Sequence, residues 1–117
     1  MANNQSFKVK NGILAQRYLQ TAVAMAANNV DLSKGTYFTK TVSSPTTFTF
    51  SNPPASGVAF AFALEIVGDG SAITWPASVK WHEATTPTVT ATKELYTFIT
   101  VDGGATYFGK QAATELA

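Results

Sequence analysis

The sequence contains no cysteine, one histidine and few charged residues. Without cysteine, these residues can form neither a disulfide bond nor a thiolate metal site. Lys, Arg, Asp and Glu make up 13% of the 117 residues, and the formal net charge is +1. No stretch gathers basic residues, so we expect no nucleic-acid partner. The low charge content has two explanations: a surface rich in threonine and alanine, or a surface covered by partner subunits.

Long apolar runs and targeting signals are also missing. The longest run of small apolar residues, 22–27, is far shorter than the roughly 20 residues that cross a membrane. Residues 1–6 are polar, and no apolar stretch follows a basic start as in a signal peptide. We therefore expect a single domain that is made in the cytoplasm, does not insert into membranes and stays soluble until it assembles.

Catalytic motifs are scarce. The single histidine, His82, lies in a polar loop without a serine motif, so we expect a solvated residue and not a catalytic base. Asp69, Asp102 and Glu94 are the candidates for a carboxylate pair, as in a polysaccharide hydrolase. However, Asp69 and Asp102 each precede a glycine in a turn, where aspartate bonds the local backbone. No calcium-binding loop motif is present, and we predict no catalytic residue, no cofactor and no metal site.

Residues from 30 onward are rich in Thr, Val, Phe and Tyr, which are typical of strands. The clearest strand is 58–67, in which large apolar residues alternate with small ones. Its large residues are Val58, Phe60, Phe62, Leu64 and Ile66, and the opposite face carries Ala59, Ala61, Ala63 and Glu65. We expect this strand at the centre of the core, with an alanine face that suits a neighbouring chain as well as water.

Further short strands follow the same alternation, separated by Gly, Pro, Asn and Ser turns. They are predicted at residues 36–42, 46–50, 72–75, 79–81, 94–101 and 106–108. Asp102, Gly103 and Gly104 predict a tight hairpin between the last two. This spacing predicts an all-β fold, namely a single antiparallel, jelly-roll-like β-sandwich over residues 30–117.

Residues 1–29 differ in composition and are predicted to form an N-terminal arm. Residues 7–10 alternate like a short strand and are followed by an Asn-Gly turn. Residues 13–27 are ambiguous between helix and strand. Leu14, Tyr18, Ala22 and Ala26 recur every four residues, which favours helix slightly.

Two tryptophans are the strongest candidates for binding residues. Exposed aromatic faces stack on sugar rings, so Trp75 and Trp81 are candidate glycan contacts or interface contacts. The alternative is that both fill the edge of the β core. Pro76 between Trp75 and Trp81 argues against a shared flat platform.

Several segments in order resemble the β-rich modules of tail-fibre and related virion structural proteins of tailed bacteriophages. The segments are residues 30–38, 46–54, 73–81, 96–98 and 102–104. Residues 7–12 are also similar to the start of structural proteins of marine and cyanobacterial podoviruses. The resemblance covers most of residues 7–109 and implies an extended conformation for residues 23–31. No long shaft or coiled coil is present, unlike in a complete long tail fibre.

The resemblance implies a non-enzymatic virion component that is made in the host cytoplasm and self-associates, with a homotrimer favoured. We expect a capsid decoration (cement) protein or a short fibre subunit, with the major capsid or tail proteins as partners. The predicted arm, residues 1–29, would dock the domain to another virion protein. The alternatives are a tail-fibre tip module, in which Trp75 and Trp81 bind host-surface glycans, and a hydrolase of host polysaccharide.

Overall fold

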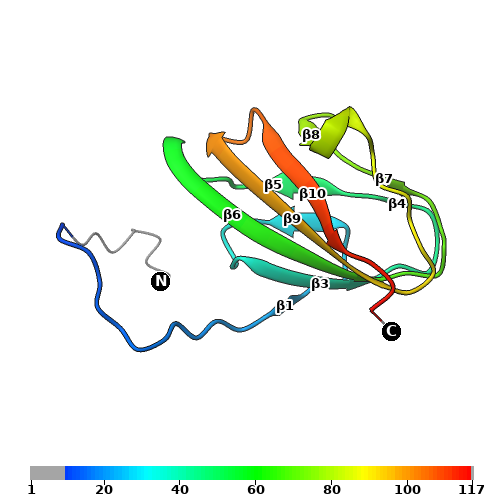
Figure 1. Cartoon of the computed structure of the whole chain (residues 1–117), viewed down its shortest axis with the longest axis horizontal. Helices are drawn as coiled ribbons and strands as arrows, with labels where there is room; N and C mark the ends of the chain where they lie inside the picture. The colour runs from blue at the N-terminus through cyan, green and yellow to red at the C-terminus, as the bar shows by residue number, and fades with distance from the viewer. Residues whose placement is uncertain (1–9, 117) are drawn as a thin grey trace.

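The computed structural model describes residues 10–116, which form strands and one short 3-10 turn (Figure 1). The strands are β1 (Val23–Ala24), β2 (Asn29–Asp31), β3 (Tyr37–Thr41), β4 (Thr46–Thr47), β5 (Thr49–Ser51), β6 (Ser56–Val67), β7 (Ile73–Thr74), β8 (Val79–Trp81), β9 (Lys93–Asp102) and β10 (Tyr107–Ala113). The 3-10 turn is η1 (His82–Ala84). The predicted all-β class is therefore confirmed.

Six strands form the main sheet, in the order β1-β3-β6-β9-β10-β8. The β6–β9 and β9–β10 pairs are antiparallel, whereas β1–β3, β3–β6 and β10–β8 are parallel. The prediction of a purely antiparallel fold is wrong, because this sheet is mixed. The physical reason is the route of the chain. After β3 it crosses to a second layer, forms β4 and β5 there, and returns as β6 in the same direction.

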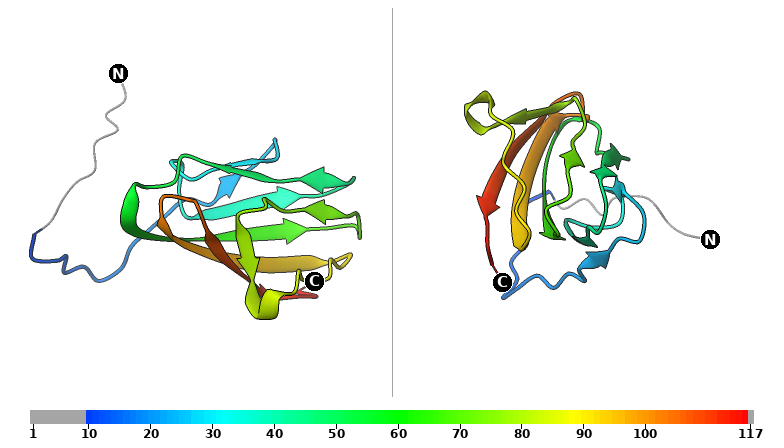
Figure 2. Two further views of the ribbon diagram at one scale, coloured as in Figure 1. Left: turned by 90° about the horizontal axis from the view of Figure 1, so that it is seen from above. Right: turned by 90° about the vertical axis from the view of Figure 1, so that its right-hand side faces the viewer.

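The second layer consists of two small parallel sheets, β2–β5 and β4–β7. Figure 2 shows this layer over one face of the main sheet. We call the covered side of the main sheet the inner face and the opposite side the outer face. The core lies between the main sheet and the second layer. Phe62 and Phe98 of the inner face stack at 5.0 Å, and Phe50 of β5 meets both rings edge-on at 5.2 Å.

The long strand β6 confirms most of the predicted alternation. Phe62, Leu64 and Ile66 are buried and Phe60 is half-buried on the same side. Val58 differs from the prediction, because its side chain is 51% exposed. The register between β6 and β9 shifts between Ser56 and Phe60, so the regular alternation does not extend to the start of the strand.

Most other strands lie within a few residues of their predicted positions, and β9 and β10 form the predicted hairpin. The segment 46–50 is divided at Phe48 into β4 and β5. The Phe48 N–H donates to the Thr74 carbonyl (2.9 Å), whereas the Thr49 N–H donates to the Asn28 carbonyl (3.1 Å). The chain thus changes its pairing partner from β7 to the segment entering β2, which ends one strand and begins the next.

The slight preference for helix over residues 13–27 is wrong. Residues 12–22 have no regular secondary structure, and β1 then pairs with Phe38 and Thr39 of β3. All residues from 10 to 22 are exposed, so an isolated helix here would have no surface on which to pack its apolar side. The extended conformation implied for residues 23–31 is confirmed at β1 and β2.

The division into an arm, 1–29, and a domain, 30–117, stays a prediction. Within the arm, Val23 and Met25 pack against the core. The predicted strand at 7–10 lies outside the described residues except for Lys10, which forms a turn with Asn11.

Candidate functional site

The two candidate binding residues, Trp75 and Trp81, lie at the rim of the core. Trp75 stacks on Phe48 at 5.3 Å with an angle of 23° between the rings, and it meets Trp81 edge-on at 5.2 Å and 72°. The Trp75 indole N–H is buried and has no hydrogen-bond partner among the described residues. The two rings therefore form no common flat platform, and the Trp75 N–H is not accessible to a ligand.

The glycine opposite Trp81 explains how these rings fit. Gly109 of β10 pairs with Trp81 of β8 and with Phe98 of β9. A Cβ atom at Gly109 would lie 3.1 Å from both the Phe98 and the Trp81 ring and 2.9 Å from a Val79 methyl group. Phe98 and Trp81 thus occupy the space that any other residue at 109 would require. The role of the tryptophans as glycan or interface contacts stays a prediction.

The single histidine lies on the surface. The His82 side chain is 65% exposed, and its Nε2 atom lies 3.8 Å from the Glu83 carboxylate. Within residues 10–116, no group of three or more His, Asp or Glu side chains is arranged to hold a metal ion.

The aspartates considered for catalysis bond the local backbone, as predicted. The Ser71 N–H donates to Asp69 and the Thr106 N–H donates to Asp102, both at 2.9 Å. The pKa of Asp69 is lowered mainly by the Ser71 hydroxyl, and the pKa of Asp102 mainly by the Thr106 N–H. Both carboxylates thus stabilise turns, and the hydrogen bonds within each loop explain why aspartate is found there.

Glu94 is fully buried on the inner face at the start of β9. One oxygen accepts a hydrogen bond from the Tyr96 hydroxyl (2.7 Å), and the other accepts one from the Thr90 N–H (2.5 Å). The Gln111 amide also donates to the Tyr96 hydroxyl (3.1 Å). Burial, followed by the bond to Glu94, raises the pKa of Tyr96. This network ties the loop before β9 to β9 and β10.

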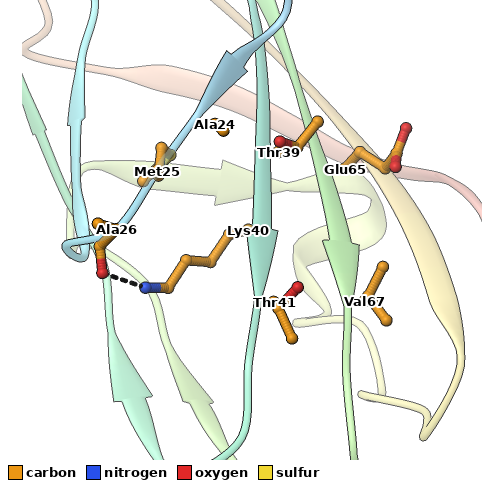
Figure 3. A pocket seen from close by; sticks show the side chains of 8 residues that line it. All are labelled: Ala24, Met25, Ala26, Thr39, Lys40, Thr41, Glu65 and Val67. Carbon is orange, nitrogen blue, oxygen red and sulfur yellow. Dashed lines mark hydrogen bonds between the residues drawn. The ribbon is translucent and has the colours of Figure 1, made fainter.

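A hollow of about 490 Å³ lies beside β1, β3 and β6 (Figure 3). Its lining includes one cation, Lys40, whose Nζ donates to the Ala26 carbonyl (2.8 Å), and one carboxylate, Glu65. Glu65 accepts from the Tyr37 hydroxyl (2.5 Å) and lies 3.7 Å from the Lys93 ammonium. The charged groups of this hollow are therefore already engaged with the chain itself.

The outer face of the main sheet carries a row of exposed apolar side chains, which the described part of the chain does not cover. Ile99, Val101 and Phe108 are 47%, 47% and 57% exposed. Ala61, Ile99 and Phe108 lie directly opposite one another on β6, β9 and β10, so they form a continuous row across three strands. A contiguous group of exposed apolar side chains is a candidate interaction site.

Two hollows mark this outer face. One, of about 300 Å³, lies over β6 and β9, where Ala61 and Ala63 leave space next to Thr97 and Ile99. The other, of about 370 Å³, lies between Ile99 and Phe108 on one side and Trp81, His82, Lys80 and Lys110 on the other. Thr97 and Ile99 line both hollows, so the two hollows are adjacent on the outer face.

The arm is the second apolar surface without cover. Ile13, Leu14, Tyr18 and Leu19 are 60%, 104%, 73% and 77% exposed. The Gln20 side chain accepts a hydrogen bond from the Thr36 hydroxyl (2.6 Å), and the arm then leaves the body of the protein (Figure 1). Large apolar side chains in this state gain stability by being buried against a partner.

Comparison with known proteins finds no matching protein-family model, curated protein or solved structure. The part of the chain that the structure describes contains no helix long and apolar enough to span a membrane.

The sequence contained partial signals for the exposed row on β9 and for the surroundings of Glu94. The alternation of 94–101 separated Ile99 and Val101 from Tyr96 and Phe98, but it did not identify which set faces outward. The same alternation places Glu94 on the side of Tyr96, and the structure shows that this side is buried.

Proposed function

We propose that this chain is a non-enzymatic, self-associating structural subunit of a bacteriophage virion, either a capsid decoration (cement) protein or a short fibre subunit. The observation that carries the proposal is the uncovered apolar outer face of the main sheet. Folding alone does not require Ile99, Val101 and Phe108 to be apolar, because none of them lies in the core.

Assembly into a particle accounts for this surface and for the low content of charged residues. The resemblance of residues 7–109 to tailed-phage structural proteins supports a virion as the place of assembly, with the major capsid or tail proteins as partners. The two layers of strands are compatible with the sandwich-like modules of such proteins. In this proposal the subunits form homo-oligomers, for which a trimer is favoured, and the arm attaches the domain to its neighbours.

Self-association is tested by measuring the mass of the purified chain in solution over a range of concentrations. We expect an oligomer, and we expect the double variant Ile99→Lys, Phe108→Lys to be a folded monomer, because two buried, unpaired charges oppose association. Thr47→Lys, an exposed change on the second layer, is the matched control and should associate normally. A chain that is monomeric at every concentration would contradict self-association.

Whether the chain is part of a virion is tested separately, by mass spectrometry of purified particles of the phage that encodes the chain. We expect the chain at a stoichiometry in the range of the structural proteins. Its absence from particles would remove the virion assignment, whatever its oligomeric state.

A second candidate function is binding of host-surface glycans by a tail-fibre tip. The hollow beside Trp81 favours it, because Phe108 contributes an aromatic side chain and Lys80, His82 and Lys110 contribute hydrogen-bond donors. A glycan array separates this function from pure assembly. Specific binding that is lost in both Trp81→Ala and Phe108→Ala would support it, and an array without binding would reject it.

A further inference from the structure

The first half of β6 has an open edge. β6 has twelve residues, but β3 has five and pairs with residues 63–67 of β6 alone. Within residues 10–116, no strand pairs with residues 57–62 of β6 on the side of β3. The Ala63 N–H points to this side, since it donates to the Thr36 carbonyl (2.9 Å). By the alternation of a strand, the backbone polar groups of Ala61 point to the same side and face the open edge.

This edge has a register shift at its start, between Ser56 and Phe60, but none of the side chains that usually protect exposed edges. Proteins usually guard a free edge with lysine, proline or inward-pointing charge. Residues 57–62 contain none of these and read Gly-Val-Ala-Phe-Ala-Phe. Unpaired backbone groups beside apolar side chains form a template for an added strand. The edge can therefore pair with an extended segment that adds to the sheet as a further strand.

The same chain carries a segment of suitable chemistry. Residues 13–22 have no regular secondary structure, are exposed, and contain neither proline nor glycine. They contain four large apolar side chains, Ile13, Leu14, Tyr18 and Leu19. Ten residues of strand span roughly 33 Å, which exceeds the length of the six-residue edge. The hollow of about 300 Å³ beside Ala61 offers space for one of these side chains.

We propose that residues 13–22 of one copy add as a strand to the open edge of β6, residues 57–62, in a second copy. The proposal rests on the proposed self-association and specifies its contacts. Each copy would donate one arm and accept another, so that the exposed arm and the open edge are both covered. Such a head-to-tail exchange generates closed rings when its rotation closes, as in a trimer.

A second copy is favoured over the chain's own arm by the course of the backbone. β1 lies on the far side of β3 from β6, and the Gln20–Thr36 hydrogen bond ties the base of the arm to the residue that precedes β3. Toward the N-terminus the arm runs away from the sheet in Figure 1 and in the left view of Figure 2. Among residues 10–116, neither residues 13–22 nor the open edge has a strand partner, and exchange between copies would pair both.

Cross-linking between copies tests this contact directly. Because the chain has no cysteine, introduced cysteines are its only thiols. We would mix the variant Leu19→Cys with a mass-tagged variant Ala61→Cys and add a short bismaleimide, which tolerates uncertainty in register. We expect a cross-linked product of mixed mass. The matched control replaces Ala61→Cys by Thr47→Cys, an exposed position on the second layer, and should give little product.

Two outcomes would overturn the proposal. One is a yield for the arm–edge mixture that is no higher than for the control. The other is found with both cysteines in one chain: a link formed only within that chain would show that the edge is covered by its own arm.

Association measurements separate this proposal from the proposed function. Replacing Ile13, Leu14, Tyr18 and Leu19 by serine should weaken self-association by about tenfold or more, because four apolar side chains lose their burial. The control Gln16→Ser, Thr21→Ser alters polar residues of the same arm and should associate normally. If the arm variant associates normally while Ile99→Lys, Phe108→Lys does not, this inference fails and the proposed self-association stands. If the unmodified chain is always monomeric, both fail.

Discussion

The two faces of the main sheet are built from the same strands but differ in what they contact. On β9, Phe98 is fully buried on the inner face, while its neighbour Ile99 is 47% exposed on the outer face. On β6, Phe62 is buried and Ala61 is exposed. Neighbouring residues of one strand thus have different roles. The inner face stabilises the folded chain, whereas the outer face is the surface at which we propose contacts with another molecule.

Two tyrosine–glutamate hydrogen bonds, one on each face, also differ in burial. The Tyr96 hydroxyl donates to the buried Glu94 carboxylate on the inner face (2.7 Å). The Tyr37 hydroxyl donates to Glu65 on the outer face (2.5 Å), where the Glu65 side chain is 24% exposed. A hydrogen bond to a buried carboxylate is costly to remove, because water cannot replace the lost donor. The chemistry of the two pairs is alike, and their burial differs.

The largest effect is expected from truncating the inner face. Phe62→Ala should lower the free energy of unfolding by about 3–5 kcal/mol, because it leaves a cavity among Phe50, Phe98 and Tyr107. Ile99→Ala on the outer face should change it by about 0.5 kcal/mol or less in the monomer. Urea unfolding followed by circular dichroism measures both. Equal losses would contradict the division into a folding face and a contact face.

A smaller loss is expected at the glycine beneath the aromatic cluster. Gly109→Ala should cost about 1–3 kcal/mol, because the added methyl group would overlap Val79 and press on the Phe98 and Trp81 rings. Lys110→Ala, its exposed neighbour on the outer face, is the control and should be nearly neutral. The change in tryptophan fluorescence of Gly109→Ala would show whether Trp81 has moved. An unchanged free energy of unfolding would mean that the side chains around Gly109 leave space for a methyl group.

The hydrogen-bond pairs give the next comparison. Tyr96→Phe should lower the free energy of unfolding by about 1–2 kcal/mol, since it leaves one oxygen of Glu94 without its tyrosine donor. Tyr37→Phe removes the equivalent bond from a partly exposed carboxylate, which water can still solvate, and should cost less. If thermal unfolding gave the reverse order, burial would not be the property that distinguishes the pairs.

The smallest effect concerns the turns, which belong to neither face. Hydrogen bonds from Ser33, Ser71 and Thr106 lower the pKa values of Asp31, Asp69 and Asp102. A carboxyl group with a lowered pKa in the folded state contributes stability above its ordinary pKa of about 4, and this contribution is lost as the pH falls through the folded value. Replacing all three by asparagine should therefore weaken the dependence of unfolding on pH between about pH 5 and pH 2. An identical pH profile would show that these turns do not couple to stability.

Local features of the fold were predictable from local patterns. Most strands, the hairpin at Asp102 and the burial of Phe62 followed from alternation and turn residues. The backbone bonding of Asp69 and Asp102 followed from the preference of aspartate for turns. Each of these depends on residues that are close together in the chain.

Features that depend on distant residues were not predictable. The parallel pairing of β3 with β6 depends on a crossover through the second layer, which strand patterns do not specify. Similarly, residues 13–27 carry a helical repeat, but the chain provides no surface for a helix there. The candidate site, an apolar outer face beside an open strand edge, required the arrangement of several strands to be known.

By itself, the sequence determined that this protein is built of strands, where most of them begin and end, and which residues share a side of each strand. The tertiary structure alone decided which strands are neighbours, which side of the main sheet the second layer covers, and that no strand within residues 10–116 pairs with the first half of β6 on the side of β3. The physical reason is that alternation is a property of a few consecutive residues, whereas pairing and coverage depend on contacts between segments far apart in the chain.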